Sequence, residues 1–268
     1  MKRNKVALFV SPENQKKFAP EIRKISGILG KAGLDMVFYK EDEEKVLKGC
    51  KVLLTLGGVG TILRGSLVAA RNNLFVLGIS KGYLGFLSEI ALEQLGEALK
   101  KFFSGEFSTD KRNFLKIKME KQTSYALNEL ALKSSHIKMM ELEVYLNDMY
   151  LTNYKADGLI VSTPTGSTAY NLSAGGPIIF PDTEVITITP ICSHALTVRS
   201  LVVSAGDVIT IRPKGPDIYA MIDGRETCNV KEEKIQVSFS KREVRFVRFS
   251  RQSFIDGLRN KLNWSGKI

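Results

Sequence analysis

The spacing of apolar residues in the first hundred positions is the feature that most constrains the fold. Four short runs there are mostly apolar and have the length of strands: VALFV (6–10), DMVFY (35–39), KVLLTL (51–56) and LFVLGI (74–79). Between them, apolar side chains recur at the spacing of one helix face, at Phe18, Ile22, Ile25 and Leu29 and again at Leu63, Leu67 and Ala70. A further helix is expected over about 91–103. Because strands that alternate with helices form βαβ units, this half is predicted to be a parallel sheet covered on both faces.

From about residue 108 the pattern changes to many short strands with little helix. The strand-like runs are FLKIKME, YALNELALK, LEVYL, GLIVST, EVITITP, LVVSAGDVITIRP, DIYAMI, KIQVSF and EVRFVRF. Asn147-Asp148 is the predicted turn of a hairpin. A pattern of many short strands with little helix is typical of a β-sandwich. We therefore predict an α/β domain over 1–105, a β-sandwich-like domain over 106–250, and a C-terminal helix within 251–268 that packs back on the first domain.

Composition excludes several classes of protein. No apolar run approaches the roughly 18 residues of a membrane span, and the run after the basic start MKRNK is too short for a signal peptide. The three cysteines, Cys50, Cys192 and Cys228, form no CxxC, and the only histidines are His136 and His194. A disulfide framework or a structural zinc site is therefore not expected, and we predict a cytoplasmic protein with reduced thiols.

The formal net charge of +11 favours anionic partners such as nucleic acid, acidic lipid or nucleotides. Only the segment SKREVRFVRFSRQ (240–252) is densely basic. Apolar residues alternate with its arginines, which predicts a half-exposed strand with a solvated face. No nucleic-acid-binding signature accompanies it, so we expect no nucleic-acid partner and no membrane partner.

The glycine-rich loop GGVGT (57–61) follows an apolar run and precedes a helical pattern. Gly57, Gly58 and Gly60 allow the backbone to adopt positive φ and to approach a ligand closely. Thr61 lies where the helix begins, so free N–H groups and the helix dipole favour an anion there, and Arg64 adds a positive charge. The loop is not a P-loop, because the chain has no GxxxxGK. The alternative is a tight turn with no ligand.

Two further stretches are rich in groups that bind nucleotides. The segment YKADGLIVSTPTGSTAYNLSAGGP (154–177) combines hydroxyls and glycines with Asp157 and Tyr170, and it follows an apolar strand, which is a common position for a binding loop. Alternatively it is a long polar loop. In ALNELAL (126–132), Asn128 could read a base edge and Glu129 could accept two ribose hydroxyls. As isolated residues in a strand, both would face solvent.

Together these three stretches resemble the bacterial NAD kinase family, which pairs a GGDGT loop with an Asn-Glu/Asp motif and a TPTGSTAY segment in this order. LGFLSEI (84–90), SAGGPI (173–178) and TPICSHALTVRSLVV (189–203) match as well, so the resemblance covers about residues 50 to 225. It implies transfer of the γ-phosphoryl group of ATP to the 2′-hydroxyl of the adenosine ribose of NAD, giving NADP, with a divalent cation (Mg²⁺ or Mn²⁺). It also implies an α/β domain plus a β domain, and a homodimer or homotetramer.

The resemblance also assigns contacts to individual positions. Gly60 would approach the dinucleotide, in the loop where Gly57, Gly58, Thr61 and Arg64 are already candidate binding residues. Asn128 would read the adenine and Glu129 the ribose, and Lys138 and Lys155 would be basic contacts. Asp157 would lie beside a ribose or the nicotinamide, and Arg225 would be a polar contact. The NAD cleft would be lined by Thr168, Ala169, Tyr170, Asn171 and Ser173.

Val59 is the departure from the family pattern, which has aspartate there as the general base that also helps to place the metal. Valine can do neither, and a β-branched residue is unusual in a glycine turn. Asp157, Glu129 and Asp223 are the carboxylates that could take over as the base, and the sequence does not select among them.

Three hypotheses about function follow. The first is an NAD kinase whose activity is impaired because Val59 replaces the aspartate. The second is a catalytically inactive NAD-binding or regulatory protein on the same scaffold. The third is a lipid kinase, which would share the glycine loop, but an acyl substrate needs an apolar groove rather than the hydroxyls of TPTGSTAY.

Overall fold

The computed structural model describes residues 3–80, 85–120, 122–134, 139–215, 217–249, 254–262 and 264. The chain divides into two compact units, unit 1 (Met1–Lys111 and Val244–Ile268) and unit 2 (Arg112–Glu243). The pattern of the sequence places the divisions near 105 and 250 instead. The difference arises because β6 (Ser108–Lys118) and β17 (Ile235–Arg248) are long strands that begin in one unit and end in the other, so no turn marks the boundary. Within the described ranges, no helix is long and apolar enough to cross a bilayer.

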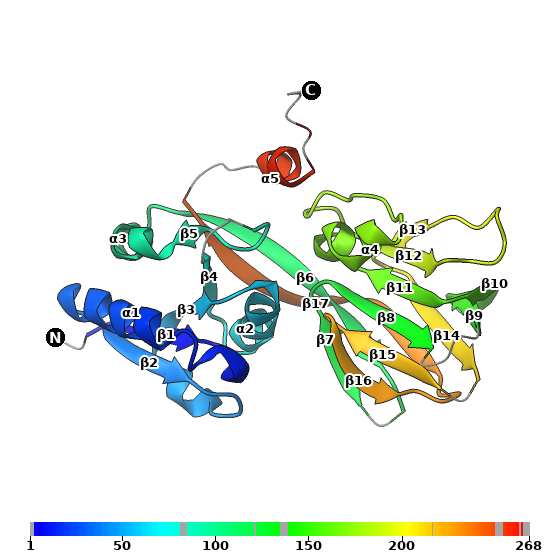
Figure 1. Ribbon diagram of the computed structural model, residues 1–268, viewed down its shortest axis with the longest axis horizontal. Helices are drawn as coiled ribbons and strands as arrows, with labels where there is room; N and C mark the ends of the chain where they lie inside the picture. Colours follow the sequence, from blue (N-terminus) through cyan, green and yellow to red (C-terminus); the bar gives the residue numbers. More distant parts are fainter. Residues whose placement is uncertain are drawn as a thin grey trace. The chain divides into compact units, whose positions relative to one another are not determined.

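Unit 1 is built on a parallel sheet with helices between its strands, as the sequence predicts (Figure 1). Its strands lie in the order β4-β3-β1-β2, and the last residues of β17 pair in parallel with β4. The elements are β1 (Lys5–Phe9), α1 (Ala19–Lys31), β2 (Asp35–Tyr39), β3 (Cys50–Leu56), α2 (Val59–Arg71), β4 (Phe75–Ser80), β5 (Ile90–Ala91) and α3 (Leu95–Ser104). The helix expected over 91–103 starts as a short 3-10 turn at Leu92–Gln94 and continues as α3.

Different helices cover the two faces of this sheet. Apolar residues of α1 and α3 share one buried cluster with alternate residues of the strands: Val6, Leu8, Ile25, Leu29, Val52, Leu54, Leu95 and Leu99. On the other face α2 lies directly against β3, where a Cβ added to Gly65 would come within 2.5 Å of Thr55 Cγ2. Glycine at this position therefore allows the helix to approach the sheet closely.

The basic segment of β17 is only partly solvated. The prediction that its arginines form a solvated face is therefore wrong at the C-terminal end of the strand. The Arg248 guanidinium pairs with Glu89 at 3.0 Å and with Asp110 at 2.9 Å, and it donates to the carbonyl of Phe86 at 3.0 Å. The Arg245 guanidinium lies 4.3 Å from the centre of the Phe75 ring. These contacts all lie within unit 1 and attach the end of β17 to β4, to the start of β6 and to the segment before β5.

Unit 2 consists of two sheets packed face to face, which confirms the predicted β-sandwich-like fold (Figure 1). One sheet has the order β13-β12-β11-β8-β15-β16, and the other contains β10-β9-β14 and the first part of β17, with β6 and β7 attached. The remaining strands are β7 (Thr123–Ala126), β8 (Glu129–Ser134), β9 (Met140–Leu146), β10 (Met149–Ala156), β11 (Gly158–Ser162), β12 (Val185–Ile191), β13 (Leu201–Ser204), β14 (Val208–Lys214), β15 (Ile218–Ile222) and β16 (Arg225–Asn229). Leu130 and Val161 of one sheet share a buried core with Val144 and Ile209 of the other.

Local predictions in this unit have different outcomes. The hairpin turn at Asn147-Asp148 is confirmed, since both residues have positive φ and the turn joins the paired strands β9 and β10. YALNELALK is two strands rather than one, because β7 ends before Leu127 and β8 starts at Glu129. KIQVSF and EVRFVRF form the single strand β17. The C-terminal helix is α5 (Phe254–Lys261), and its Gly257 lies against the Phe86 ring of unit 1.

Candidate functional site

The polar motifs of unit 2 meet at one edge of a sheet, where three neighbouring strands end. β8 lies between β11 and β15 and is antiparallel to both, so the start of β8 adjoins the ends of the other two. Glu129 opens β8 directly opposite Ser162, the last residue of β11. The TPTG sequence follows β11 from Thr163 onward, and Asp223 follows β15. The antiparallel register therefore brings together three segments that are far apart in the chain.

Asp223 holds the Asn-Glu motif in place through the backbone. Its carboxylate accepts hydrogen bonds from the N–H groups of Leu127 (2.9 Å), Asn128 (2.7 Å) and Glu129 (3.3 Å). Burial raises the pKa of Asp223, whereas these three bonds and the nearby charge of Arg225 lower it. With both oxygens engaged by main-chain donors, Asp223 is a positioning residue in this structure.

The backbone of Asn128 lies directly under the TPTG turn. Its carbonyl accepts the N–H of Thr163 at 2.9 Å, and the Thr163 hydroxyl donates to the carbonyl of Leu127. A Cβ on Gly166 would lie 2.2 Å from the Asn128 carbonyl oxygen, so only glycine allows the turn to approach this closely. The side chain of Asn128 makes no hydrogen bond within the described part of the chain, so its amide is available to a ligand.

Asn128 and Glu129 are buried, so the expectation that they face solvent as isolated residues is wrong. They are 6% and 4% exposed. The Glu129 carboxylate accepts the backbone N–H of Tyr170, and its Oε2 has no hydrogen-bond partner. Burial, followed by repulsion from Asp223, raises the pKa of Glu129 to about 8. A buried carboxyl with one unsatisfied oxygen is suited to a ligand that brings hydroxyl groups.

The raised pKa of Glu129 predicts a pH-dependent stability. Between the ordinary pKa of 4.5 and about 8, the folded chain keeps a proton that the unfolded chain releases. The free energy of unfolding therefore falls as pH rises through this window. We expect Glu129→Gln to remove this pH dependence. Across the window it amounts to a loss of about 3–5 kcal/mol in the free energy of unfolding of the parent protein. Urea unfolding of both proteins from pH 5 to 9 measures it.

The matched control for this prediction is Glu184→Gln, which changes an exposed carboxyl of the same unit. It should keep the slope of the parent protein. Equal slopes in the parent and in Glu129→Gln would mean that Glu129 ionises normally.

Further along the TPTGSTAY segment, some predicted contacts are structural and others are accessible. Asn171 is fully buried: its amide nitrogen donates to the carbonyl of Pro177 at 3.1 Å, and its oxygen accepts the Thr189 hydroxyl at 2.7 Å. By contrast, Thr168, Ala169 and Tyr170 are half-buried and Ser173 is exposed. The Lys133 ammonium lies 5.8 Å from the centre of the Tyr170 ring. The structure thus gives Asn171 a role in holding the loop, and its contact with NAD stays a prediction.

The structure does not bring every predicted residue of unit 2 to this edge. Asp157 precedes β11 whereas Thr163 follows it, so roughly 20 Å of extended chain separates them. Lys155 is near Asp157 and pairs with Glu141 at 3.0 Å. Arg225, by contrast, starts β16 two residues after Asp223, next to the motif. Lys138 lies outside the described residues.

In unit 1 the GGVGT loop connects β3 to α2, and only one of its glycines has an unusual backbone. Gly57 has φ 150°, and a Cβ there would lie 2.5 Å from Thr61 Oγ1. Gly58 has an ordinary φ of −77° and Gly60 is helical, so only Gly57 uses the positive φ that glycine allows. Val59 is the first residue of α2 rather than part of the turn, and its side chain is 48% exposed.

The anion-binding features of this loop differ from those expected. Thr61 is buried, and its N–H already donates to the Gly58 carbonyl at 3.0 Å. Within the described residues, the N–H groups of Val59 and Gly60 have no backbone acceptor, so they are the available donors. Arg64 pairs with Glu13 at 3.2 Å and with Glu41 at 3.8 Å, which neutralises its charge.

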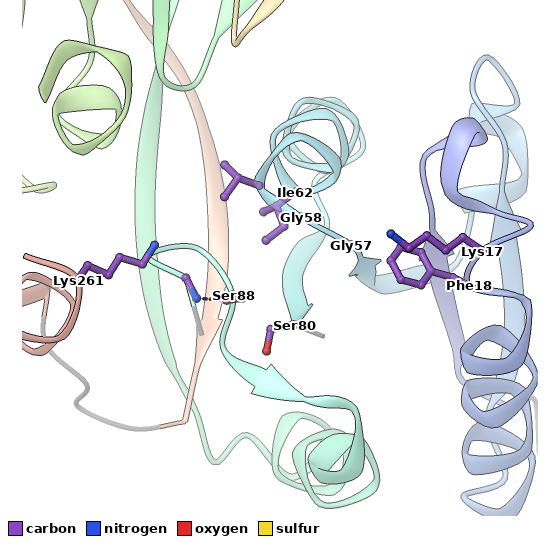
Figure 2. A pocket seen from close by; sticks show the side chains of 10 residues that line it. Lys17, Phe18, Gly57, Gly58, Ile62, Ser80, Ser88 and Lys261 are labelled. Carbon is purple, nitrogen blue, oxygen red and sulfur yellow. Dashed lines mark hydrogen bonds between the residues drawn. The ribbon is translucent and has the colours of Figure 1, made fainter. Parts of the chain in front are cut away.

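The loop lines a cavity of about 490 Å³ within unit 1 (Figure 2). The lining residues are Lys17, Phe18, Gly57, Gly58, Val59, Ile62, Ser80, Gly85, Ser88 and Lys261. Among the described residues that line it, the positively charged ones are Lys17, before α1, and Lys261, the last residue of α5. No sequence pattern pointed to either lysine, because they lie near opposite ends of the chain and outside every motif.

The described residues do not offer a set of ligands for a divalent cation. None of the ten residues that line the cavity is acidic, and the described part of the chain has no group of three or more His, Cys, Asp or Glu that could hold a metal ion. Mg²⁺ prefers carboxylate and phosphate oxygens. With valine at position 59, the loop lacks the one carboxylate that the family pattern supplies.

The fold is similar to that of two solved kinases. A yeast NADH kinase in complex with NADH has a TM-score of 0.83 at 22% identity, with 99% of this chain and 89% of that chain covered. An NAD kinase from Archaeoglobus fulgidus in complex with ATP has a TM-score of 0.76 at 23% identity, with 97% of each chain covered. The fold is therefore that of kinases that act on nicotinamide dinucleotides.

Sequence relatives identify the family. The ATP-NAD kinase N-terminal domain matches residues 10–107 and the ATP-NAD kinase C-terminal domain matches residues 127–249. The NAD kinase of Caldicellulosiruptor saccharolyticus is 34% identical over 250 residues, which cover 92% of this chain and 96% of that protein. The NAD kinase of Solibacter usitatus is 39% identical over 230 residues, 82% and 80% of the two chains. This chain belongs to the NAD kinase family, which confirms the resemblance.

Proposed function

We propose that this chain phosphorylates the 2′-hydroxyl of the adenosine ribose of NAD with ATP, and that it does so slowly. The observation that carries the proposal is the shared sheet edge of unit 2, where an unpaired amide (Asn128) and a buried, protonated carboxyl (Glu129) adjoin the TPTGSTAY segment. An amide reads an adenine edge, and a carboxyl with an unsatisfied oxygen accepts ribose hydroxyls. The family and its relatives support the reaction.

Val59 is the reason to expect a slow reaction. Its side chain has no atom that can accept the proton of the 2′-hydroxyl. Phosphoryl transfer depends mainly on positioning and on electrostatic stabilisation of the phosphate oxygens, so loss of a base slows the step without abolishing it. A general base typically contributes about 10²–10⁴-fold. The other carboxylates considered do not replace it. Asp223 is engaged by three N–H groups, and Asp157 lies at the far end of β11. Glu129 keeps its own proton at neutral pH, because burial raises its pKa to about 8.

A divalent cation would have to reach the protein already bound to the phosphates of ATP. The described residues provide no ligand set of their own for it. When bound, the cation would neutralise charge on the phosphate oxygens. The chain's part is to bind the nucleotides, to orient the ribose and to exclude water.

The first experiment is an NADP-formation assay on the full chain, with ATP, NAD and Mg²⁺ or Mn²⁺, coupled to an NADP-specific dehydrogenase. We expect slow but measurable NADP formation that depends on both substrates. NAD binding without any NADP under these conditions would instead support the alternative, an inactive NAD-binding or regulatory protein on the same scaffold. That alternative is favoured by one observation, the apolar side chain of Val59 in the loop.

Asn128→Ala is expected to weaken NAD binding by at least about tenfold, because it removes the hydrogen bonds of a buried amide to the base. The fold should be preserved, since the bonds to Thr163 and Asp223 involve only the backbone of Asn128. Calorimetric titration with NAD measures the change. Asn153→Ala, which removes an amide on β10 bonded to Glu141, is the control. Unchanged affinity in Asn128→Ala would reject the assignment of adenine to this residue.

We also propose, from the family resemblance, that the protein acts in the cytoplasm as a homodimer or homotetramer. Light scattering of the purified chain tests the assembly.

A further inference from the structure

We propose that the cavity of unit 1 holds the phosphate groups of the phosphoryl donor through the ammonium groups of Lys17 and Lys261. Glycine-loop N–H groups complete the site. This inference rests on the proposed function, and it names the residues that bind the donor. Lys261 belongs to α5, which lies beyond both matched family domains, so no comparison assigns it a role.

The two lysines reach the cavity from different segments. Figure 2 shows Lys261 entering from α5 and Lys17 from the segment before α1, with Gly57 and Gly58 between them. All of these residues belong to unit 1. The volume of about 490 Å³ is within the range of small-molecule sites. Two cations on opposite sides of a glycine loop can contact different oxygens of one polyphosphate chain.

Neither lysine has an acidic partner within the described chain. Some other cations of unit 1 are paired, as Lys24 is with Glu93, Arg64 with Glu13 and Arg71 with Glu44. Lys17 and Lys261 contact aromatic rings instead: the Lys17 ammonium lies 5.8 Å from the centre of Phe18, and that of Lys261 lies 4.5 Å from the centre of Phe86. These contacts hold the side chains without neutralising them, so both charges remain available to an anion.

The surroundings of Lys261 also favour an anionic ligand. Its ammonium is close enough to Gly85 that a Cβ there would lie 3.8 Å from Nζ, next to the hydroxyl of Ser88. Partial burial lowers the pKa of Lys261, which means that the charged form lacks some of the solvation it has in water. A phosphate oxygen would restore this solvation.

The loop contributes neutral donors that suit the same ligand. The N–H groups of Val59 and Gly60 have no backbone acceptor in the described chain, and they lie at the start of α2, where the helix dipole favours negative charge. A Cβ added at Gly58 or Gly60 would have no other atom within 4 Å, so the space beside these glycines is open. Two lysines and Val59, with its free N–H group, therefore line one cavity, and none of the described residues that line it is acidic.

The two lysines are also compatible with the absence of a carboxylate at position 59. An aspartate at position 59 would repel phosphate oxygens unless a divalent cation lay between them. With valine there, the lysines can meet the phosphates directly. We therefore expect donor phosphates to bind this chain without a divalent cation.

The test is calorimetric titration of the full chain with inorganic tripolyphosphate in the presence of EDTA. We expect binding to the parent protein. Lys17→Gln and Lys261→Gln should each weaken it at least about fivefold, and the double variant should weaken it about 25-fold, the product of the two. Lys261→Arg keeps the charge and should stay within about twofold of the parent.

Two control variants remove one positive charge elsewhere. Lys16→Gln lies next to Lys17 in the chain, and Arg259→Gln lies on the same helix as Lys261 but is paired with Asp256. Both should change tripolyphosphate affinity less than about twofold, which separates a local site from the general field of the +11 net charge. Thermal unfolding of every variant checks that the fold is retained.

The outcomes separate this inference from the proposed function. No tripolyphosphate binding to the parent, or equal affinities in the parent and the double variant, would overturn the inference while NADP formation stood. Lysine-dependent binding in a chain that forms no NADP would support the phosphate site and reject the kinase proposal. NAD affinity should be the same in all variants, and a parallel loss of NAD binding would place the lysines in the NAD site instead.

Discussion

Replacing Val59 with aspartate is expected to raise kcat for NADP formation by about 10²–10⁴-fold, because it restores a general base to the loop. The affinity for NAD should change less than a few-fold, since the dinucleotide contacts proposed for Asn128 and Glu129 lie in unit 2. A steady-state assay at saturating ATP and NAD, with Mg²⁺, measures kcat. The same assay without divalent cation should show little gain, because the new carboxylate would then face the phosphates unscreened.

The fold should tolerate this substitution. Val59 is the first residue of α2 and is 48% exposed, so no packed core is disturbed. A carboxylate in the first turn of a helix is mildly stabilising, by about 0.3–1 kcal/mol. Val59→Asn is the matched control, because asparagine has the same shape as aspartate but cannot accept the proton. Equal kcat in the Asp and Asn variants, or no rise in Val59→Asp, would show that the base assignment is wrong for this protein.

Asp223→Asn is expected to lower the free energy of unfolding by about 2–3 kcal/mol and to weaken NAD binding more than tenfold. The carboxylate accepts three backbone N–H groups, with Leu127 bonded to one oxygen and Asn128 and Glu129 bonded to the other. An amide in either orientation would direct an NH₂ group at one or more of these donors. The Asn-Glu motif would then lose the geometry that holds it under the TPTG turn.

Urea unfolding and NAD titration measure the two effects together. Asp182→Asn, an exposed aspartate of the same unit, is the control and should change neither quantity. A variant of Asp223 with normal stability and normal NAD binding but no turnover would mean that this carboxylate acts as the base. The expected result, a joint loss of stability and binding, identifies it as a positioning residue.

The periodic patterns determined most of the local structure. Strand and helix in unit 1 follow the switch between apolar runs and helical spacing, because each element must bury one face or stripe against the sheet. The hairpin at Asn147-Asp148 follows from two residues that tolerate positive φ. The GGVGT, Asn-Glu and TPTGSTAY motifs identified the family, since nucleotide chemistry requires particular groups in a particular order.

Only the tertiary structure decided which of these groups are buried, paired or available. In sequence Asn128 and Glu129 look like exposed strand residues, but both are buried where β8 pairs with β11 and β15 and where Asp223 binds their backbone. Arg64 appeared to be the cation of the glycine loop, but two glutamates neutralise it. Lys17 and Lys261, from the two ends of the chain, share one cavity that no local pattern marks. Burial and charge pairing depend on contacts between distant segments, and a local sequence pattern carries no record of those contacts.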